Sequence, residues 1–287
     1  MTSSSQTAST PTAGRNLPVA IGVGVVLFGA IAVGLFFAPW LFIGLVAVGF
    51  CLGALEVHHA LLRVGMRSSA KVIITGTAVS VIGGYLVTVL HLPISPTTFI
   101  VCCLAGTMMA SFVARLRLGP EDFIPDAAAS ALIITYIPLM GVFVPLLMAE
   151  PQWNLRTISI IVCVIAADTG AYAFGSLFGR HKMAPRISPK KTWEGLGGAL
   201  GTAAAVGLAA AVWVLGQPWW VGVILGLATA LSGTLGDLVE SLIKRGAGLK
   251  DMSNFLPGHG GVMDRLDSML FAVPVGWLVL HLDLAQL

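Results

Sequence analysis

Long, continuously apolar stretches separated by short polar connections dominate the hydropathy pattern of this chain. None shows the strict alternation over about ten residues that marks the strands of transmembrane β-barrels. Each is close to the roughly 20 apolar residues that a helix needs to cross a bilayer, where backbone groups must be paired internally. The pattern predicts an all-α, polytopic integral membrane protein with about nine transmembrane helices. The expected spans are 17–38, 40–61, 70–91, 96–114, 125–148, 157–178, 195–215, 219–243 and 266–282.

Composition agrees with a membrane location. Of the 287 residues, 56% are hydrophobic and only 10% are charged, whereas about a quarter of the residues in a soluble domain are charged. Residues 1–16 are polar and rich in Ser and Thr, so we expect a disordered tail there. The rest divides into N-terminal transmembrane helices, about five over 17–155, and a C-terminal transmembrane region over 156–287, expected to be catalytic.

The basic residues are concentrated in alternate connections. Of the 16 Lys and Arg residues, 14 lie in four connections, near 63–71, 115–122, 180–191 and 244–265, and the intervening connections contain only Arg156. Because Lys and Arg are retained on the cytoplasmic side, these loops are predicted to be cytoplasmic, and with nine spans the amino terminus is cytoplasmic as well. Two of the loops, 179–194 and 244–265, should carry the polar chemistry.

Four acidic residues inside predicted spans are candidates for functional sites, because a charge within a membrane is costly unless it is paired or hydrated. They are Glu56, Asp168, Asp237 and Glu240. Asp168, Tyr172 and Gly175 follow at helical spacing and share one face,. They predict either a wall of a polar cavity or a buried Asp–Tyr hydrogen bond between helices. Glu56 lies near the end of the second span, where we interpret it as an end cap that snorkels to the interface.

The loop 179–194 is the most basic stretch of the chain. Ser188 and Pro189 are typical of an N-cap and a first helical residue, which would place Lys190 and Lys191 in the first turn of a helix,. Two cations there oppose the helix dipole, and a bound phosphate would offset this. The alternative is that these residues only serve to retain the loop in the cytoplasm.

A polar stripe runs along the end of the eighth predicted span. Asp237, Glu240, Ser241 and Lys244 occupy positions i, i+3, i+4 and i+7 of one helix face,. Two carboxylates one turn apart are hard oxygen ligands that suit Mg²⁺. The alternative is an internal network in which Glu pairs with Lys and Asp with Ser.

The following loop and the start of the ninth span hold the second half of the candidate site. The run Gly258-His259-Gly260-Gly261 has almost no side-chain bulk, so its backbone can approach a ligand closely,. Asp264 and Asp267 follow, with Arg265 between them, and predict a cation and an anion bound together. A lone His259 does not make a zinc site, and the chain contains no P-loop.

These motifs resemble one protein family. The stretch SLIKRGAGLKDMSNFLPGHGGVMDRLDS, from Ser241 to Ser268, is similar to the signature of the phosphatidate cytidylyltransferases, the CDP-diacylglycerol synthase family. The upstream pieces DTGAYAFGSLFGR, ISPKKTWEG and GDLVES also resemble that family and occur in the expected order. The resemblance covers residues 168–268 motif by motif, and the first half of the chain by hydropathy only.

The resemblance implies an activity and a set of site residues. CMP would pass from CTP to phosphatidic acid, with Mg²⁺ required and a second cation left open, at the cytoplasmic face of the inner (plasma) membrane. It also suggests a homodimer and no nucleic-acid partner. The implied metal ligands are Asp237, Asp264 and Asp267, and the implied catalytic cations are Lys191, Lys244 and Arg265. The remaining candidates, all for substrate binding, are Asp168, Tyr172, Ser188, Lys190, Thr192, Glu240, Ser241, Arg245, Lys250, Asp251, His259, Gly260 and Gly261.

Two other functions remain as alternatives. A related membrane enzyme acting on another lipid phosphate would use the same metal site. An ion-coupled transporter would use Asp168, Asp237 and Glu240 as an ion path, but it predicts these residues near the bilayer midplane. Asp237 and Glu240 instead lie within about two turns of a basic loop, at about 1.5 Å per residue, which places them near the membrane surface and argues against a transporter.

Overall fold

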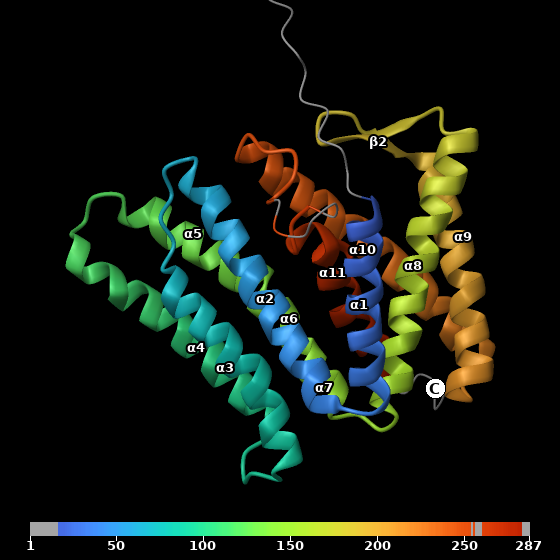
Figure 1. Cartoon of the computed structure of the whole chain (residues 1–287), viewed down its shortest axis with the longest axis horizontal. Coiled ribbons are helices and arrows are strands. Elements are labelled where there is room, and N and C mark those ends of the chain that lie inside the picture. The colour runs from blue at the N-terminus through green and yellow to red at the C-terminus, as the bar shows by residue number, and fades with distance from the viewer. Residues whose placement is uncertain (1–16, 254, 256–259, 283–287) are drawn as a thin grey trace, which may run out of the picture.

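The computed structural model describes residues 17–253, 255 and 260–282, and this part of the chain is almost entirely helical (Figure 1). The predicted tail 1–16 and His259 lie outside the described residues. The all-α prediction is confirmed, apart from one small hairpin. The helices are α1 (Leu17–Phe36), α2 (Pro39–Leu62), α3 (Ala70–Val89), α4 (Pro96–Arg115), α5 (Phe123–Tyr136), α6 (Pro138–Gly141), α7 (Phe143–Met148), α8 (Trp153–Phe178), α9 (Trp193–Ala210), α10 (Trp219–Gly246) and α11 (Met263–His281), with short turns η1 (Leu116–Leu118) and η2 (Ala211–Leu215).

Seven helical segments in the described ranges are long and apolar enough to cross a membrane. They correspond to seven of the predicted spans, and α1 and α11 occupy the positions of the other two. The predicted span 125–148 is built from three consecutive helices, α5, α6 and α7. The first break precedes Pro138, which has no backbone N–H to donate the hydrogen bond that a continuous helix needs.

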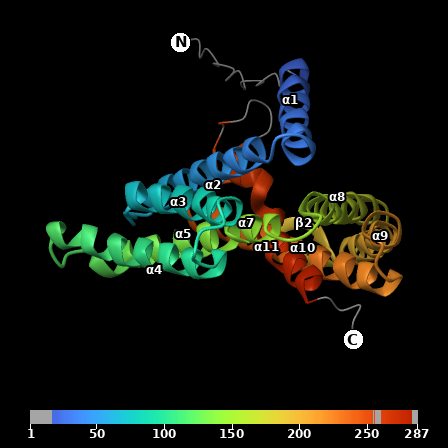
Figure 2. The same ribbon diagram turned by 90° about the horizontal axis from the view of Figure 1, so that it is seen from below.

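Helix α11 lies between two groups of helices. Figure 2 shows α3, α4 and α5 on one side and α8, α9 and α10 on the other, with α11 between them. In agreement, α11 contacts α10 and α8 on one side and α2, α6 and α7 on the other. Helix α1 stands apart and packs on α2. Polar residues at the start of α11 are therefore within reach of both groups.

Small residues allow α8, α9 and α10 to pack with their backbones close together. A Cβ atom on Gly170 of α8 would lie 2.6 Å from the Gly198 carbonyl oxygen of α9, and one on Gly207 would lie 2.2 Å from the Gly222 carbonyl oxygen of α10. Thr202 adds an interhelical hydrogen bond, donated to the Ala166 carbonyl oxygen at 2.8 Å. Such contacts replace the hydrophobic driving force that helices lack in lipid.

The prediction of a helix beginning at Ser188 is wrong. Ser188–Thr192 forms strand β2, which pairs antiparallel with β1 (Lys182–Ala184), so Lys190 and Lys191 lie in a hairpin. The helix begins at Trp193, because Thr192 provides the cap by accepting a hydrogen bond from the Gly195 N–H at 3.1 Å. Pro189 is tolerated because a two-stranded hairpin leaves edge positions without a ladder hydrogen bond.

Candidate functional site

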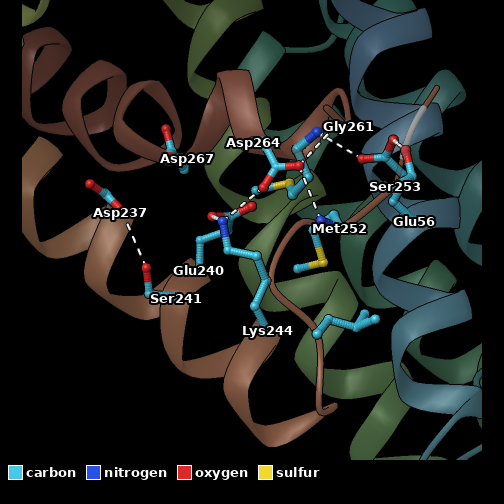
Figure 3. A network of polar contacts seen from close by, with 12 residues as sticks. Glu56, Asp237, Glu240, Ser241, Lys244, Met252, Ser253, Gly261, Asp264 and Asp267 are labelled. Carbon is cyan, nitrogen blue, oxygen red and sulfur yellow. Dashed lines mark hydrogen bonds and ion pairs between the residues drawn. The ribbon is translucent and has the colours of Figure 1, made fainter. Parts of the chain in front are cut away.

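An acidic cluster lies where α10 and α11 meet. Asp237 and Glu240 of α10 and Asp267 of α11 each place one carboxylate oxygen within 4.8 Å of the others. Figure 3 shows Asp237, Glu240 and Asp267 on facing sides of these two helices. Glu240 is fully buried. The spacing of three residues between Asp237 and Glu240 along α10 and the packing of α11 on α10 bring the three side chains together.

Lys244 joins this cluster to the start of α11. Its ammonium group pairs with Glu240 one turn back along α10 and with Asp264 Oδ1 at 2.7 Å. The other oxygen of Asp264, Oδ2, accepts hydrogen bonds from the Met252 N–H at 3.1 Å and the Gly261 N–H at 2.8 Å. Asp264 therefore holds Lys244 and two points of the loop (Figure 3), and the structure gives it different neighbours from Asp237 and Asp267.

Glu56 of α2 fixes the start of α11 from the other side. Its carboxylate accepts hydrogen bonds from Ser253 Oγ at 2.5 Å, the Val262 N–H at 3.0 Å and the Met263 N–H at 2.8 Å. A negative charge is favourable at these free N–H groups of a helix start. The interpretation of Glu56 as a snorkelling cap is wrong, because the residue is buried, with 7% exposed.

The same contact explains a glycine of the signature. A Cβ atom on Gly261 would lie 2.7 Å from Glu56 Oε2, closer than carbon and oxygen can approach without displacement. Glycine at this position lets the loop backbone reach the carboxylate.

A cavity of about 230 Å³ adjoins the acidic cluster between α8, the hairpin, α9 and α10. Asp237 is a member of the acidic cluster and also lines the cavity. Its Oδ2 forms an ion pair with Lys191 Nζ at 2.6 Å. Lys191 also donates to the Thr234 carbonyl oxygen at 3.2 Å. The described lining residues are Ala167, Asp168, Ala171, Tyr172, Met183, Lys190, Lys191, Thr192, Gly195, Leu196, Thr234 and Asp237.

The positions of Asp168 and Tyr172 decide between the two interpretations of this pair, a cavity wall or a buried hydrogen bond. Both residues line the cavity, and Tyr172 is 79% exposed. A buried Asp–Tyr hydrogen bond between helices is therefore wrong for this pair.

The hairpin that carries Lys190 and Lys191 is anchored to α9 by Glu194. This carboxylate accepts hydrogen bonds from the Arg180 N–H at 3.1 Å and the His181 N–H at 3.2 Å, and it pairs with His181 Nδ1 at 2.6 Å. Arg245 ties the end of α10 to the same hairpin by donating to the Ile187 carbonyl oxygen at 3.3 Å. These contacts fix the lysines over the cavity.

The other predicted site residues are more dispersed. Ser241 donates to Asp237 Oδ1 at 3.4 Å, so both contacts of the internal network predicted along α10 are present. Lys250 and Asp251 are exposed after the end of α10, and Ser188 begins β2. Gly260 has a φ of +82°, a conformation that glycine adopts without strain, and Arg265 follows Asp264 in the first turn of α11.

The chemistry of the acidic cluster suits a divalent cation. Mg²⁺ prefers carboxylate oxygens together with waters and phosphates, and all three donors are of this kind,. Apart from the ion pair with Lys244, neither oxygen of the buried Glu240 has a hydrogen-bond partner among the described residues. Three carboxylates so close together repel one another, which a cation would relieve.

Comparisons with known proteins agree with these features. The model of the cytidylyltransferase family matches residues 18–283. A phosphatidate cytidylyltransferase of Mycobacterium leprae is 37% identical over 284 residues, covering 96% of this chain and 91% of the relative. One from Mycobacterium bovis is 34% identical over 285 residues, covering 95% and 91%. One from Pseudomonas aeruginosa is 51% identical over 131 residues, covering 43% of this chain and 48% of the relative. The chain therefore belongs to the cytidylyltransferase family.

Proposed function

We propose that this protein is a phosphatidate cytidylyltransferase, which transfers CMP from CTP to phosphatidic acid and gives CDP-diacylglycerol and pyrophosphate. The observation that carries the proposal is the junction at Asp237 of the acidic cluster with a cavity lined by Lys190 and Lys191. Two polyanions must meet in this reaction, and positioning plus charge neutralisation accounts for most catalysis of phosphoryl transfer. Relatives of that name match almost the whole chain.

Three carboxylates, Asp237, Glu240 and Asp267, would hold Mg²⁺. Bound there, the cation would neutralise charge on the triphosphate of CTP. Asp264 would serve a different purpose from the one expected from the sequence, because its oxygens already accept hydrogen bonds from Lys244 and two backbone N–H groups. It would keep Lys244 and the loop in place beside the cation.

Lys190 and Lys191 would bind phosphate oxygens in the cavity, which also has apolar walls at Ala167, Ala171 and Leu196. Such a mixed lining suits a lipid phosphate at the boundary between membrane and water. An oxygen of the phosphatidate monoester attacks the α-phosphorus of CTP, and the bond from that phosphorus to the bridging oxygen breaks to release pyrophosphate. The second pKa of a phosphate monoester is about 6, so the attacking group is ionised at neutral pH and needs no strong general base.

We further propose nine spans, a cytoplasmic amino terminus and a site that opens to the cytoplasm at the inner membrane. The support is the distribution of 14 of the 16 basic residues over alternate connections,. The hairpin, the connection between α10 and α11 and the connection between α4 and α5 all lie at the same end of the molecule (Figure 1). A homodimer is proposed from the family resemblance alone.

The test is a product assay. Purified protein in detergent, given phosphatidic acid, labelled CTP and Mg²⁺, should form a labelled lipid that depends on all three. A parallel reaction in which another lipid phosphate replaces phosphatidic acid addresses the related enzyme. If only that second lipid is labelled, the proposed substrate is wrong, and if neither is labelled, the proposed reaction is wrong.

A further inference from the structure

Tyr136, the last residue of α5, is a buried polar residue that no sequence motif marks. Only 5% of its surface is exposed, and its hydroxyl has no hydrogen-bond partner among the described residues. Buried hydroxyl groups in native proteins nearly always have a partner, because an unpaired one loses its hydrogen bonds to water without replacement. An unpaired hydroxyl at this buried position therefore indicates a partner other than the described protein groups,.

The surroundings of Tyr136 indicate where the partner binds. Its ring packs against Phe271 of α11, with the ring centroids 6.1 Å apart, and Phe271 lies one turn after Asp267. The carboxylates of Glu240, Asp267 and Asp237 are all near enough to act electrostatically on the phenol. These are the three members of the acidic cluster, and the hydroxyl bonds to none of them directly.

A phenol hydroxyl beside carboxylates would be expected to donate to one of them, since it is a good donor and they are good acceptors. Among the described residues the phenol has no acceptor, and both oxygens of Glu240 have no hydrogen-bond partner beyond the Lys244 ion pair. Unused groups on both sides indicate that an oxygen-bearing ligand belongs between them. A water or a phosphate oxygen on a cation held by these carboxylates would accept the hydrogen bond of the phenol.

We propose that Tyr136 is a positioning residue of the site, whose hydroxyl donates a hydrogen bond to an oxygen ligand of the cation held by Asp237, Glu240 and Asp267. The inference rests on the proposed function only in requiring a divalent cation at this cluster. With Tyr136, a residue of α5 in the first half of the chain contributes to the site. Helix α5 lies on the opposite side of α11 from α8 and α9 (Figure 2).

The test compares Tyr136→Phe with Tyr85→Phe. Each substitution removes one hydroxyl from a buried tyrosine and keeps the ring. Tyr85 of α3 is 6% exposed, its ring lies edge-on to Trp40, and α3 packs mainly on α2 and α4. Mn²⁺ affinity is measured by electron paramagnetic resonance without nucleotide and then with CTP, and melting is measured in EDTA. The KM for Mg²⁺ and kcat are measured in the transfer assay.

Tyr136→Phe should melt in EDTA at or above the wild-type temperature, because it removes an unpaired buried hydroxyl. It should bind Mn²⁺ about fivefold or more weakly, the equivalent of one hydrogen bond, while Tyr85→Phe should bind as the wild type does. A loss without nucleotide identifies a water ligand, and a loss only with CTP identifies a phosphate oxygen.

Wild-type affinity of Tyr136→Phe under both conditions overturns the inference. A lower melting temperature with unchanged affinity also overturns it, because the hydroxyl would then be structural. Wild-type protein that binds Mn²⁺ but transfers no CMP refutes the proposed function and leaves this comparison of affinities intact.

Discussion

Lys244→Met should destabilise the protein more than the loss of any other lysine of the site. The ammonium group of Lys244 pairs with Glu240 and Asp264, and the three side chains are 11%, 0% and 9% exposed. Methionine keeps the unbranched apolar stem of lysine but has no ammonium group, so it leaves two buried carboxylates without their common cation. Breaking a buried pair by removing one partner costs about 3–5 kcal/mol. A chain of this size should then melt roughly 6 °C or more below the wild type.

The assay is thermal unfolding in detergent with EDTA, so that no cation compensates for the lost charge. Lys191→Met is the matched control, because Lys191 also pairs with a carboxylate of α10, at 2.6 Å, but the two side chains are 21% and 32% exposed. Partly solvated pairs contribute about 0–1 kcal/mol. Lys191→Met should therefore melt within about 3 °C of the wild type while losing at least about tenfold in CMP transfer, or 1.4 kcal/mol.

A second substitution separates charge from packing. In Lys244→Met/Glu240→Gln one of the two stranded charges is gone, so part of the lost stability should return, by at least about 1 kcal/mol. Unchanged melting of Lys244→Met would refute the buried bridge. Equal melting of Lys244→Met with and without Glu240→Gln would show that the loss comes from packing.

Two further predictions concern the loop and the topology. Glu56→Gln should lower the melting temperature by a few degrees, because a neutral amide offers only one oxygen to three donors at the start of α11,; unchanged melting would contradict the cap, and the exposed Glu121→Gln is the control. A cysteine at Ser188 should react only with a reagent added from the cytoplasm, and one at Gln217 only from outside; labelling of Gln217 from the cytoplasm would overturn the proposed arrangement of nine spans.

The sequence predicted the features that depend on neighbours along the chain. Continuous apolar runs predicted the helices, since length and hydropathy are local properties. Helical spacing placed Asp237, Glu240 and Lys244 on one face, and Asp264 and Asp267 belong to α11, the next helix along the chain. Ser188 matched the signal for a helix start as well as Thr192 does. The pairing of β2 with β1 makes Ser188 part of a strand, so the helix begins after Thr192. The N-cap rule uses only neighbouring residues and cannot predict this pairing.

Contacts between distant parts of the chain could not be predicted in this way. Glu56 accepts hydrogen bonds from Val262 and Met263, which are 206 and 207 residues away. Nothing in the local sequence distinguishes such a carboxylate from one that reaches the interface. Tyr136 sits in an apolar run like any other aromatic residue, and only the contact of its ring with Phe271 of α11 indicates that it lies near the acidic cluster.

We propose that Asp237 and Asp267 bind the cation on which CMP transfer depends. The most direct measurement is the Mg²⁺-dependent rate of CMP transfer by Asp237→Asn, Asp267→Asn and the double variant, with Glu121→Gln as a control outside the site. Each single variant should lose nearly all activity, because each removes a charged oxygen ligand. The double variant should be no worse than the more impaired single variant, since ligands of one cation act as a unit. Wild-type activity in Asp237→Asn would contradict the account.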